Sequence, residues 1–287
     1  MVFGSKIIVE ANLFNSEHID GAGSFDYIQC EPGAKPQILK HNVRDLVRKL
    51  QVDDPYTFGL LKCKGFVAET VPAGYAELLS LTLVFREPPG PRSLREILLN
   101  TPTSTSTTRR LEITRDLARS VGYVHTFCFV HKNLVLRISD ETKGWTARRG
   151  DNVPDKNLHR HPPRQGFSPH DDYEMHHYIY SLGVCLLEIG LWGSFVEYDP
   201  TTGAHSLSQL LTARSEKDKD LFVALAQCPL PGSMGDTYAE IVETCLTCLD
   251  PGNVDSGDEK AFEDEDGILV GVRYIEKVLL RLGKPIM

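Results

Sequence analysis

The chain has 287 residues, of which 41% are hydrophobic and 24% are charged, and its formal net charge at pH 7 is −8. This length accommodates one two-lobed domain or two small domains with a sizeable core. Because the balance is acidic and no segment combines clustered Lys and Arg with aromatic residues, nucleic acid is excluded as an expected partner.

The first part of the chain is predicted to be rich in strands. Three apolar runs are expected to form them: residues 6–9, 58–69 and 78–86. A polar, glycine-bearing stretch follows the first run to about residue 37. Apolar residues at helical spacing predict a helix over residues 41–50, and Pro72 and Gly74 are expected at the turn between the last two strands.

A proline-rich run over residues 87–91 (EPPGP) marks the end of this part. Neither a helix interior nor a central strand accommodates so many prolines, so we expect a rigid connector. The chain is therefore predicted to be an α+β protein, with a strand-rich unit over residues 1–90 and a mainly helical unit over residues 91–287.

Apolar periodicity predicts seven helices in the second part. They are expected over residues 93–99, 109–125, 178–192, 206–214, 219–228, 237–250 and 268–283. The helix over residues 178–192 is apolar on all sides, which predicts that it lies in the middle of the helical unit. It also contains Glu188 and is too short to cross a bilayer, so no membrane span is expected.

Several motifs in this order resemble those of protein kinases. Residues 129–134 (FVHKNL), which follow a predicted helix, resemble the kinase segment that leads into the HRD catalytic loop. Residues 180–188 (YSLGVCLLE) resemble the central kinase helix, and residues 83–87 resemble the hinge strand that holds adenine. Together they cover roughly residues 40–250, and the resemblance implies a protein-kinase-like two-lobed fold with a truncated N-lobe.

In finer detail the chain is similar to a fungal group of kinase-like domains that often follow a HET-s/LopB-type (HeLo) prion-forming or cell-death domain. Residues 157–166 (NLHRHPPRQG), the helix over residues 180–192 and the acidic ending over residues 264–276 fit this group. The resemblance implies a signalling or scaffold module with other proteins as partners, in fungal incompatibility or death signalling.

The residues that phosphoryl transfer requires are incomplete. The catalytic loop is degenerate at His131, Lys132 and Asn133, because the neutral amide of Asn133 stands where an Asp should accept a proton. No DFG metal motif follows, and Asp140 and Asp151 lie too close to the flanking motifs to replace it. We therefore expect a pseudokinase rather than an enzyme, with no catalytic residue and no metal ligand assigned.

Two alignments of the N-lobe stay open. In the first, residues 7–12 correspond to the lysine-bearing strand but contain no Lys, and the following helix offers only Asp45 as the acidic partner. In the second, residues 21–25 (GAGSF) are similar to the start of a kinase Gly-rich loop, and Lys35 is the phosphate-binding lysine.

A possible adenine hinge at Val84, Phe85 and Arg86 belongs to the alternative function, an ATP-binding and weakly active protein Ser/Thr kinase. No cofactor is expected under the pseudokinase interpretation, and ATP with Mg²⁺ is expected under the alternative.

Histidines and cysteines also form patterns that we interpret as structural. Five histidines match no zinc spacing and are expected in a solvated loop: His159, His161, His170, His176 and His177. Cys245 and Cys248 are predicted to be two buried thiols on one helical face. The seven cysteines are scattered and odd in number, and the N-terminus shows no secretory signal pattern, so free thiols and a cytoplasmic location are expected.

Overall fold

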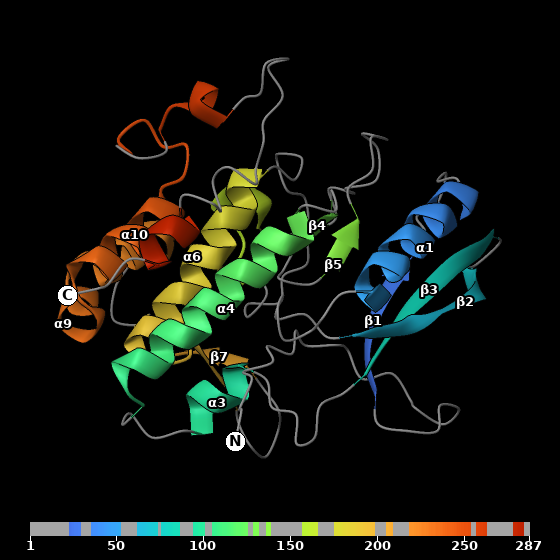
Figure 1. Ribbon diagram of the computed structural model, residues 1–287, viewed down its shortest axis with the longest axis horizontal. Helices are drawn as coiled ribbons and strands as arrows, with labels where there is room; N and C mark the ends of the chain where they lie inside the picture. The colour runs from blue at the N-terminus through green and yellow to red at the C-terminus, as the bar shows by residue number, and fades with distance from the viewer. Residues whose placement is uncertain are drawn as a thin grey trace.

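The computed structural model places a small antiparallel sheet with one helix at one end and a bundle of helices at the other (Figure 1). This arrangement confirms the α+β class. The structure describes residues 23–29, 36–52, 62–73, 76–86, 94–100, 105–125, 129–131, 136–138, 157–165, 175–198, 205–208, 218–253, 257–262 and 278–283. Among these residues, no helix combines the length and the apolar character that a membrane crossing requires.

The sheet contains three strands: β1 (Gly23–Gln29), β2 (Cys63–Ala73) and β3 (Ala76–Arg86). Both pairings are antiparallel and the strand order is β1-β3-β2, so β3 is central. The predicted strand over residues 78–86 is confirmed, whereas β1 is a strand that the sequence pattern does not predict. Gly, Ser and Asp are weak strand formers, and they occupy three of its first four positions. The strand predicted over residues 6–9 lies outside the described residues.

The start and end of β2 differ from the prediction. The strand begins at Cys63 rather than residue 58, and Pro72, predicted at the turn, lies within the strand and pairs with Glu77. Proline has no backbone N–H to donate, but β2 is an edge strand of the described sheet, where one side of the backbone needs no partner. Gly74 lies outside the described residues.

One helix, α1 (Pro36–Val52), contacts β2 and β3. Four buried apolar residues follow the helical spacing predicted for residues 41–50: Val43, Leu46, Val47 and Leu50. Proline suits the first position of a helix, because the N–H that it lacks would have no partner there. On the sheet, Cys63, Leu83 and Phe85 are also buried. The larger core of the helical part includes none of these seven residues.

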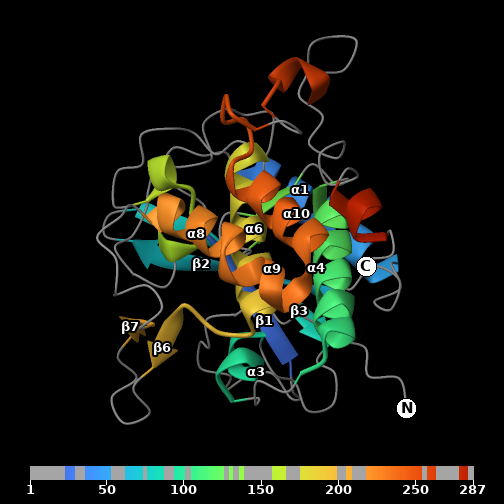
Figure 2. The same cartoon turned by 90° about the vertical axis from the view of Figure 1, so that its left-hand side faces the viewer.

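The helical part is built around α6 (Met175–Leu191), which lies beside α4 (Thr107–His125) and next to the helices near the C-terminus (Figures 1 and 2). Every residue from His177 to Gly190 is buried, so the predicted central position of this helix is confirmed. The surrounding helices are α3 (Leu94–Asn100), α8 (Asp218–Gln227), α9 (Pro229–Met234) and α10 (Asp236–Leu246). Six short elements are also present: β4 (Phe129–His131), β5 (Leu136–Ile138), β6 (Val196–Tyr198), β7 (His205–Leu207), η1 (Pro162–Arg164) and η2 (Glu259–Phe262). Of the helix predicted over residues 268–283, residues 278–283 are helical and the remainder lies outside the described part.

A buried tyrosine joins three of these helices. The hydroxyl of Tyr238 on α10 donates to the backbone oxygen of Leu186 on α6 over 2.8 Å, and lies 2.9 Å from the hydroxyl of Thr114 on α4. The helices α6 and α10 can come this close because α6 presents glycines to α10. A Cβ atom at Gly183 would lie 2.9 Å from the Cβ atom of Cys245 and 3.1 Å from the backbone nitrogen of Leu246.

The C-terminal end of α6 is closed by a left-handed residue and by an arginine. Trp192 has a φ of 53°, and the N–H of Gly193 donates to the oxygen of Glu188 over 3.1 Å, as in a Schellman motif. Arg110 donates to the oxygen of Gly190 over 2.9 Å and lies over the Trp192 ring. A cation at this position also interacts favourably with the helix dipole.

Two helix predictions near the C-terminus need correction, and one short helix there is not predicted. Residues 206 and 207 belong to β7, which pairs with β6, and residues 209–214 lie outside the described part. The helix predicted over residues 237–250 ends at Leu246, and Leu249 adopts a positive φ of 63°. The short helix α9 is not predicted, because its sequence PLPGSM contains two prolines and a glycine. Both prolines lie in its first turn, where a missing N–H is tolerated.

The close approach of α6 and α10 gives a first prediction. Replacing Gly183 with Ala should lower the free energy of unfolding by about 1–3 kcal/mol, because the atoms that its Cβ would meet belong to backbone and to a short side chain. Gly232→Ala is the matched control, since a Cβ atom there meets no atom within 4 Å, and its stability should be unchanged or raised by up to about 1 kcal/mol. Equal stability of the two variants in chemical denaturation would contradict this packing.

Candidate functional site

The possible adenine hinge lies at the end of β3, and its backbone is occupied on both sides. Val84, Phe85 and Arg86 pair with β1 on one edge, and Val84 and Phe85 pair with β2 on the other. Beyond the end of β2, the N–H of Arg86 donates to the oxygen of Lys62 over 2.8 Å. The thiol of Cys63 donates to the oxygen of Val84 over 3.5 Å. Hydrogen bonds to a nucleotide at these residues would therefore compete with the sheet.

The described strand that precedes α1 and pairs with β3 is β1, and the segment over residues 7–12 lies outside the described residues. Residues 23–25 of the predicted Gly-rich loop form the start of β1, and residues 21 and 22 lie outside the described part, so the loop interpretation stays a prediction. Lys35 lies outside the described residues. On α1, Asp45 lies 3.2 Å from His41 and 3.3 Å from Arg48, so its carboxylate is engaged on the surface of its own helix.

The segment predicted to be a degenerate catalytic loop lies at a short hairpin. His131 ends β4 and pairs with Leu136 of β5, while Phe129 pairs with Ile138. Only the four residues 132–135 separate the two strands. Lys132, Asn133 and the two aspartates considered as metal ligands, Asp140 and Asp151, lie outside the described residues.

A cluster of functional side chains does form elsewhere, where residues 157–165 lie against α6. In this segment the imidazole Nε2 of His159 lies 2.8 Å from a carboxylate oxygen of Glu188. The other oxygen of Glu188 accepts the N–H of Phe195 over 2.8 Å. Burial alone would raise the pKa of Glu188, but His159, the Phe195 N–H and Arg95 outweigh it and hold the pKa below its ordinary value. The buried carboxylate is therefore ionised and holds the segment on the helix.

Cys185 lies beside this pair, and its Sγ atom and the ligand atoms of His159 and Glu188 are all within 4.8 Å of one another. Burial, and then the charge of Glu188, raise the pKa of this thiol far above its ordinary value. The thiol stays protonated and is a poor nucleophile and metal ligand.

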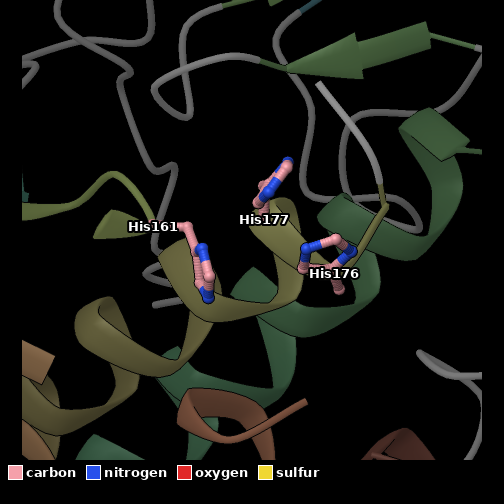
Figure 3. A group of neighbouring side chains, drawn as sticks. All are labelled: His161, His176 and His177. Carbon is pink, nitrogen blue, oxygen red and sulfur yellow. The ribbon is translucent and has the colours of Figure 1, made fainter. Parts of the chain in front are cut away.

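Three imidazoles form a second cluster at the start of α6, which we call the histidine trio: His161, His176 and His177 (Figure 3). Ring centroids are 5.4 Å apart for His161 and His176, 5.0 Å for His161 and His177, and 3.9 Å for the two neighbours on α6. The 3-10 helix η1 follows directly after His161 and positions that side chain. The ring of Tyr180 packs edge-on against His161 at 5.1 Å.

Two members of the trio, His161 and His177, are uncharged at neutral pH. Burial, then the charges of Lys219 and His176, lower the pKa of His161 from 6.5 to about 3. Burial, then the neighbouring His176, His161 and Arg164, lower the pKa of His177 to about 2. A proton on one ring would be poorly solvated and repelled by these cations.

The expectation of a solvated histidine loop is therefore wrong for the described histidines. His159 and His177 are buried, His161 and His176 are half-buried, and His170 lies outside the described residues. The spacing of the histidines could not predict the trio, because the fold brings His161 next to residues that follow it by fifteen and sixteen positions. The prediction that Cys245 and Cys248 are buried is confirmed. Cys248, however, lies in the turn beyond α10 and not on the helix.

No model of a known protein family matches the chain. A comparison with curated proteins likewise finds no significant match. The resemblance inferred from the motifs therefore stays a prediction.

Removing the buried carboxylate tests the anchor of residues 157–165. Glu188→Ala should lower the free energy of unfolding by about 3–5 kcal/mol, because it leaves the partners of a buried ionised group without their acceptor. Glu240→Ala on α10 is the control, since its exposed ion pair with Arg281 is worth about 0–1 kcal/mol. Urea denaturation measures both variants, and a small effect at Glu188 would contradict the anchor.

The trio also predicts how stability depends on pH. The imidazoles of the unfolded chain take up protons below pH 6.5, whereas His161 and His177 in the folded chain do so only near pH 3 and pH 2. Their contribution to stability is therefore complete above about pH 6.5 and is lost as the pH falls towards those lower values, by up to about 1.4 kcal/mol per pH unit for each histidine.

Urea denaturation between pH 7 and pH 5, in the presence of a chelator, measures this slope. The variant His161→Gln should show a shallower slope than the wild type, whereas His41→Gln, on an exposed face of α1, should keep the wild-type slope. Parallel slopes for all three proteins would show that His161 is not neutral in the folded state over this pH range.

Proposed function

We propose that this chain is a protein-kinase-like domain that binds other proteins and does not transfer phosphate. The fungal signalling role and the cytoplasmic location implied by the resemblance to HeLo-associated domains are part of the proposal. One observation carries it: the β4–β5 hairpin leaves too little chain for a catalytic loop.

In the kinase signature, an Asp stands two positions after the loop histidine, and a metal-binding Asn stands seven positions after it. Counted from His131, these positions are Asn133 and Ile138. Ile138 is the last residue of β5 and is paired with Phe129, so it has neither the side chain nor the position to bind Mg²⁺. An amide at position 133 cannot take up the proton of a substrate hydroxyl.

The N-terminal part supports the same conclusion. Kinases pair a lysine, on the strand before a helix, with a glutamate on that helix, and the pair holds the ATP phosphates. The order strand, helix, strand, strand of β1, α1, β2 and β3 corresponds to this arrangement, but β1 (GSFDYIQ) contains no lysine. Asp45 on α1 interacts with His41 and Arg48 instead. The paired backbone of Val84 to Arg86 also leaves a weak basis for adenine binding.

The packing of the helical part supports a folded binding module rather than an unfolded remnant of a kinase. Its central helix is buried along its length, and Glu188 fixes residues 157–165 upon it. The separate cores of the two parts are consistent with the predicted boundary near residue 90, which stays a prediction.

Nucleotide binding and turnover separate this proposal from the weakly active kinase. The full chain with ATP and Mg²⁺ should keep the melting temperature of the protein alone, and radiolabelled phosphate should not reach the chain or a generic substrate above a heat-killed control. A ligand at 100 times its dissociation constant would add about 2.7 kcal/mol of stability, which a thermal shift detects easily.

The variant Lys35→Ala gives the internal control. Under the proposal it behaves as the wild type in both assays. Transfer by the wild type that is lost in Lys35→Ala, or after replacement of Asn133, would overturn the proposal in favour of an active kinase. A thermal shift without transfer would instead identify a nucleotide-sensing module.

A further inference from the structure

We propose that the histidine trio binds a divalent transition-metal ion such as Zn²⁺ through one nitrogen each of His161, His176 and His177. This inference is independent of the proposed function, because it uses none of the residues that the kinase resemblance assigns to nucleotide binding. Metal binding at this position would fasten the segment that contains η1 to the first turn of α6.

The three side chains already lie near coordination geometry. One ligand nitrogen from each residue lies within 4.8 Å of the others, and Figure 3 shows the three side chains near the start of α6. Nitrogens bound tetrahedrally to Zn²⁺ lie about 3.3 Å apart, since each is about 2.0–2.1 Å from the ion. Small side-chain rotations are enough to close this difference. The backbone beneath two of the ligands is the buried helix α6, which limits how far they can move apart.

An unsatisfied atom points to a missing ligand. Nδ1 of His161 is buried and has no hydrogen-bond partner among the described residues. Such a group loses its hydration without compensation, and in a native protein it usually indicates an additional bound water or ion. A metal ion bound at this nitrogen would satisfy it.

The chemistry of the ligands selects the metal. Neutral imidazoles are good ligands for Zn²⁺, Cu²⁺ and Ni²⁺, whereas Mg²⁺ and Ca²⁺ require carboxylate and carbonyl oxygens that the trio lacks. Three protein ligands leave a fourth tetrahedral position for water.

The charges nearby are compatible with a cation. Arg164 and Lys219 act on the trio as positive charges. The ammonium of Lys219, however, lies 2.7 Å from a carboxylate oxygen of Asp250, which offsets its charge. Arg164 also interacts with other residues of the protein. Neither cation therefore faces the site as an isolated charge.

The other group of metal-ligating residues, His159, Cys185 and Glu188, is a weaker candidate. Both oxygens of Glu188 already accept hydrogen bonds, and the raised pKa of the Cys185 thiol opposes the thiolate that a metal needs. The trio contains no thiol.

Titration of the metal-free, untagged full chain with Co²⁺ tests the site, because Co²⁺ substitutes for Zn²⁺ and its visible spectrum reports the ligand type. We expect one saturable equivalent with ligand-field bands of nitrogen and oxygen coordination, no thiolate charge-transfer band, and displacement by Zn²⁺. The variants His161→Gln and His176→Gln should each bind at least about 10-fold more weakly. His41→Gln, whose side chain is 67% exposed on α1, should bind as the wild type.

Several results would overturn the site. They are a wild type that gives no bands, variants of the trio that bind Co²⁺ as tightly as the wild type, and a thiolate band that disappears in Cys185→Ser. Thermal melting checks that each variant is folded. If the trio variants do not fold, X-ray absorption of the Zn²⁺-loaded wild type decides: three imidazole ligands support the proposal and fewer contradict it.

Discussion

A single buried carboxylate fixes the arrangement of the helical part. The helix α6 is buried from His177 to Gly190, so any charge on it has to be satisfied inside the protein. The carboxylate of Glu188 has two hydrogen-bonding partners, one from each chain segment that flanks the helix. They are His159, which precedes the helix, and the N–H of Phe195, which follows it. The carboxylate thereby joins the segment before α6 to the chain that leaves it, and the histidine trio is held next to the same helix.

Burial on all sides was predictable for α6, because its sequence has no polar face. The amphipathic helices α1, α4 and α8 were predictable for the opposite reason, since each has one apolar stripe. The elements that sequence patterns missed depend on partners far away in the chain. The strand β1 is stabilised by its pairing with β3 rather than by its own composition, and Pro72 fits a strand only because β2 is at the sheet edge.

The candidate site was predictable only in part. The degenerate loop after His131 follows from local sequence, and the β4–β5 hairpin agrees with the short spacing there. The contact between His159 and Glu188 and the grouping of the trio do not follow from spacing, because both require residues 157–165 to return against α6. Local patterns contain no information about that long-range contact. In a similar sequence, the signal for this contact would be a single Glu within an apolar central helix, together with histidines in the segments that flank the helix.

The two proposals share one physical picture. Under both proposals, residues 157–165 are held on α6 by the buried contact between His159 and Glu188 and by a metal at the trio. A scaffold that is ordered in this way does not depend on bound Mg–ATP.

A double-mutant cycle between His159 and Glu188 tests this picture most directly, because it isolates their mutual interaction from the effect of each truncation. Unfolding free energies of the wild type, His159→Ala, Glu188→Ala and the double variant should give a coupling of about 0.5–3 kcal/mol, as for contacting residues in one network. If the two substitutions are additive within experimental error, the buried pair does not hold residues 157–165 on α6, and the account of this scaffold is wrong.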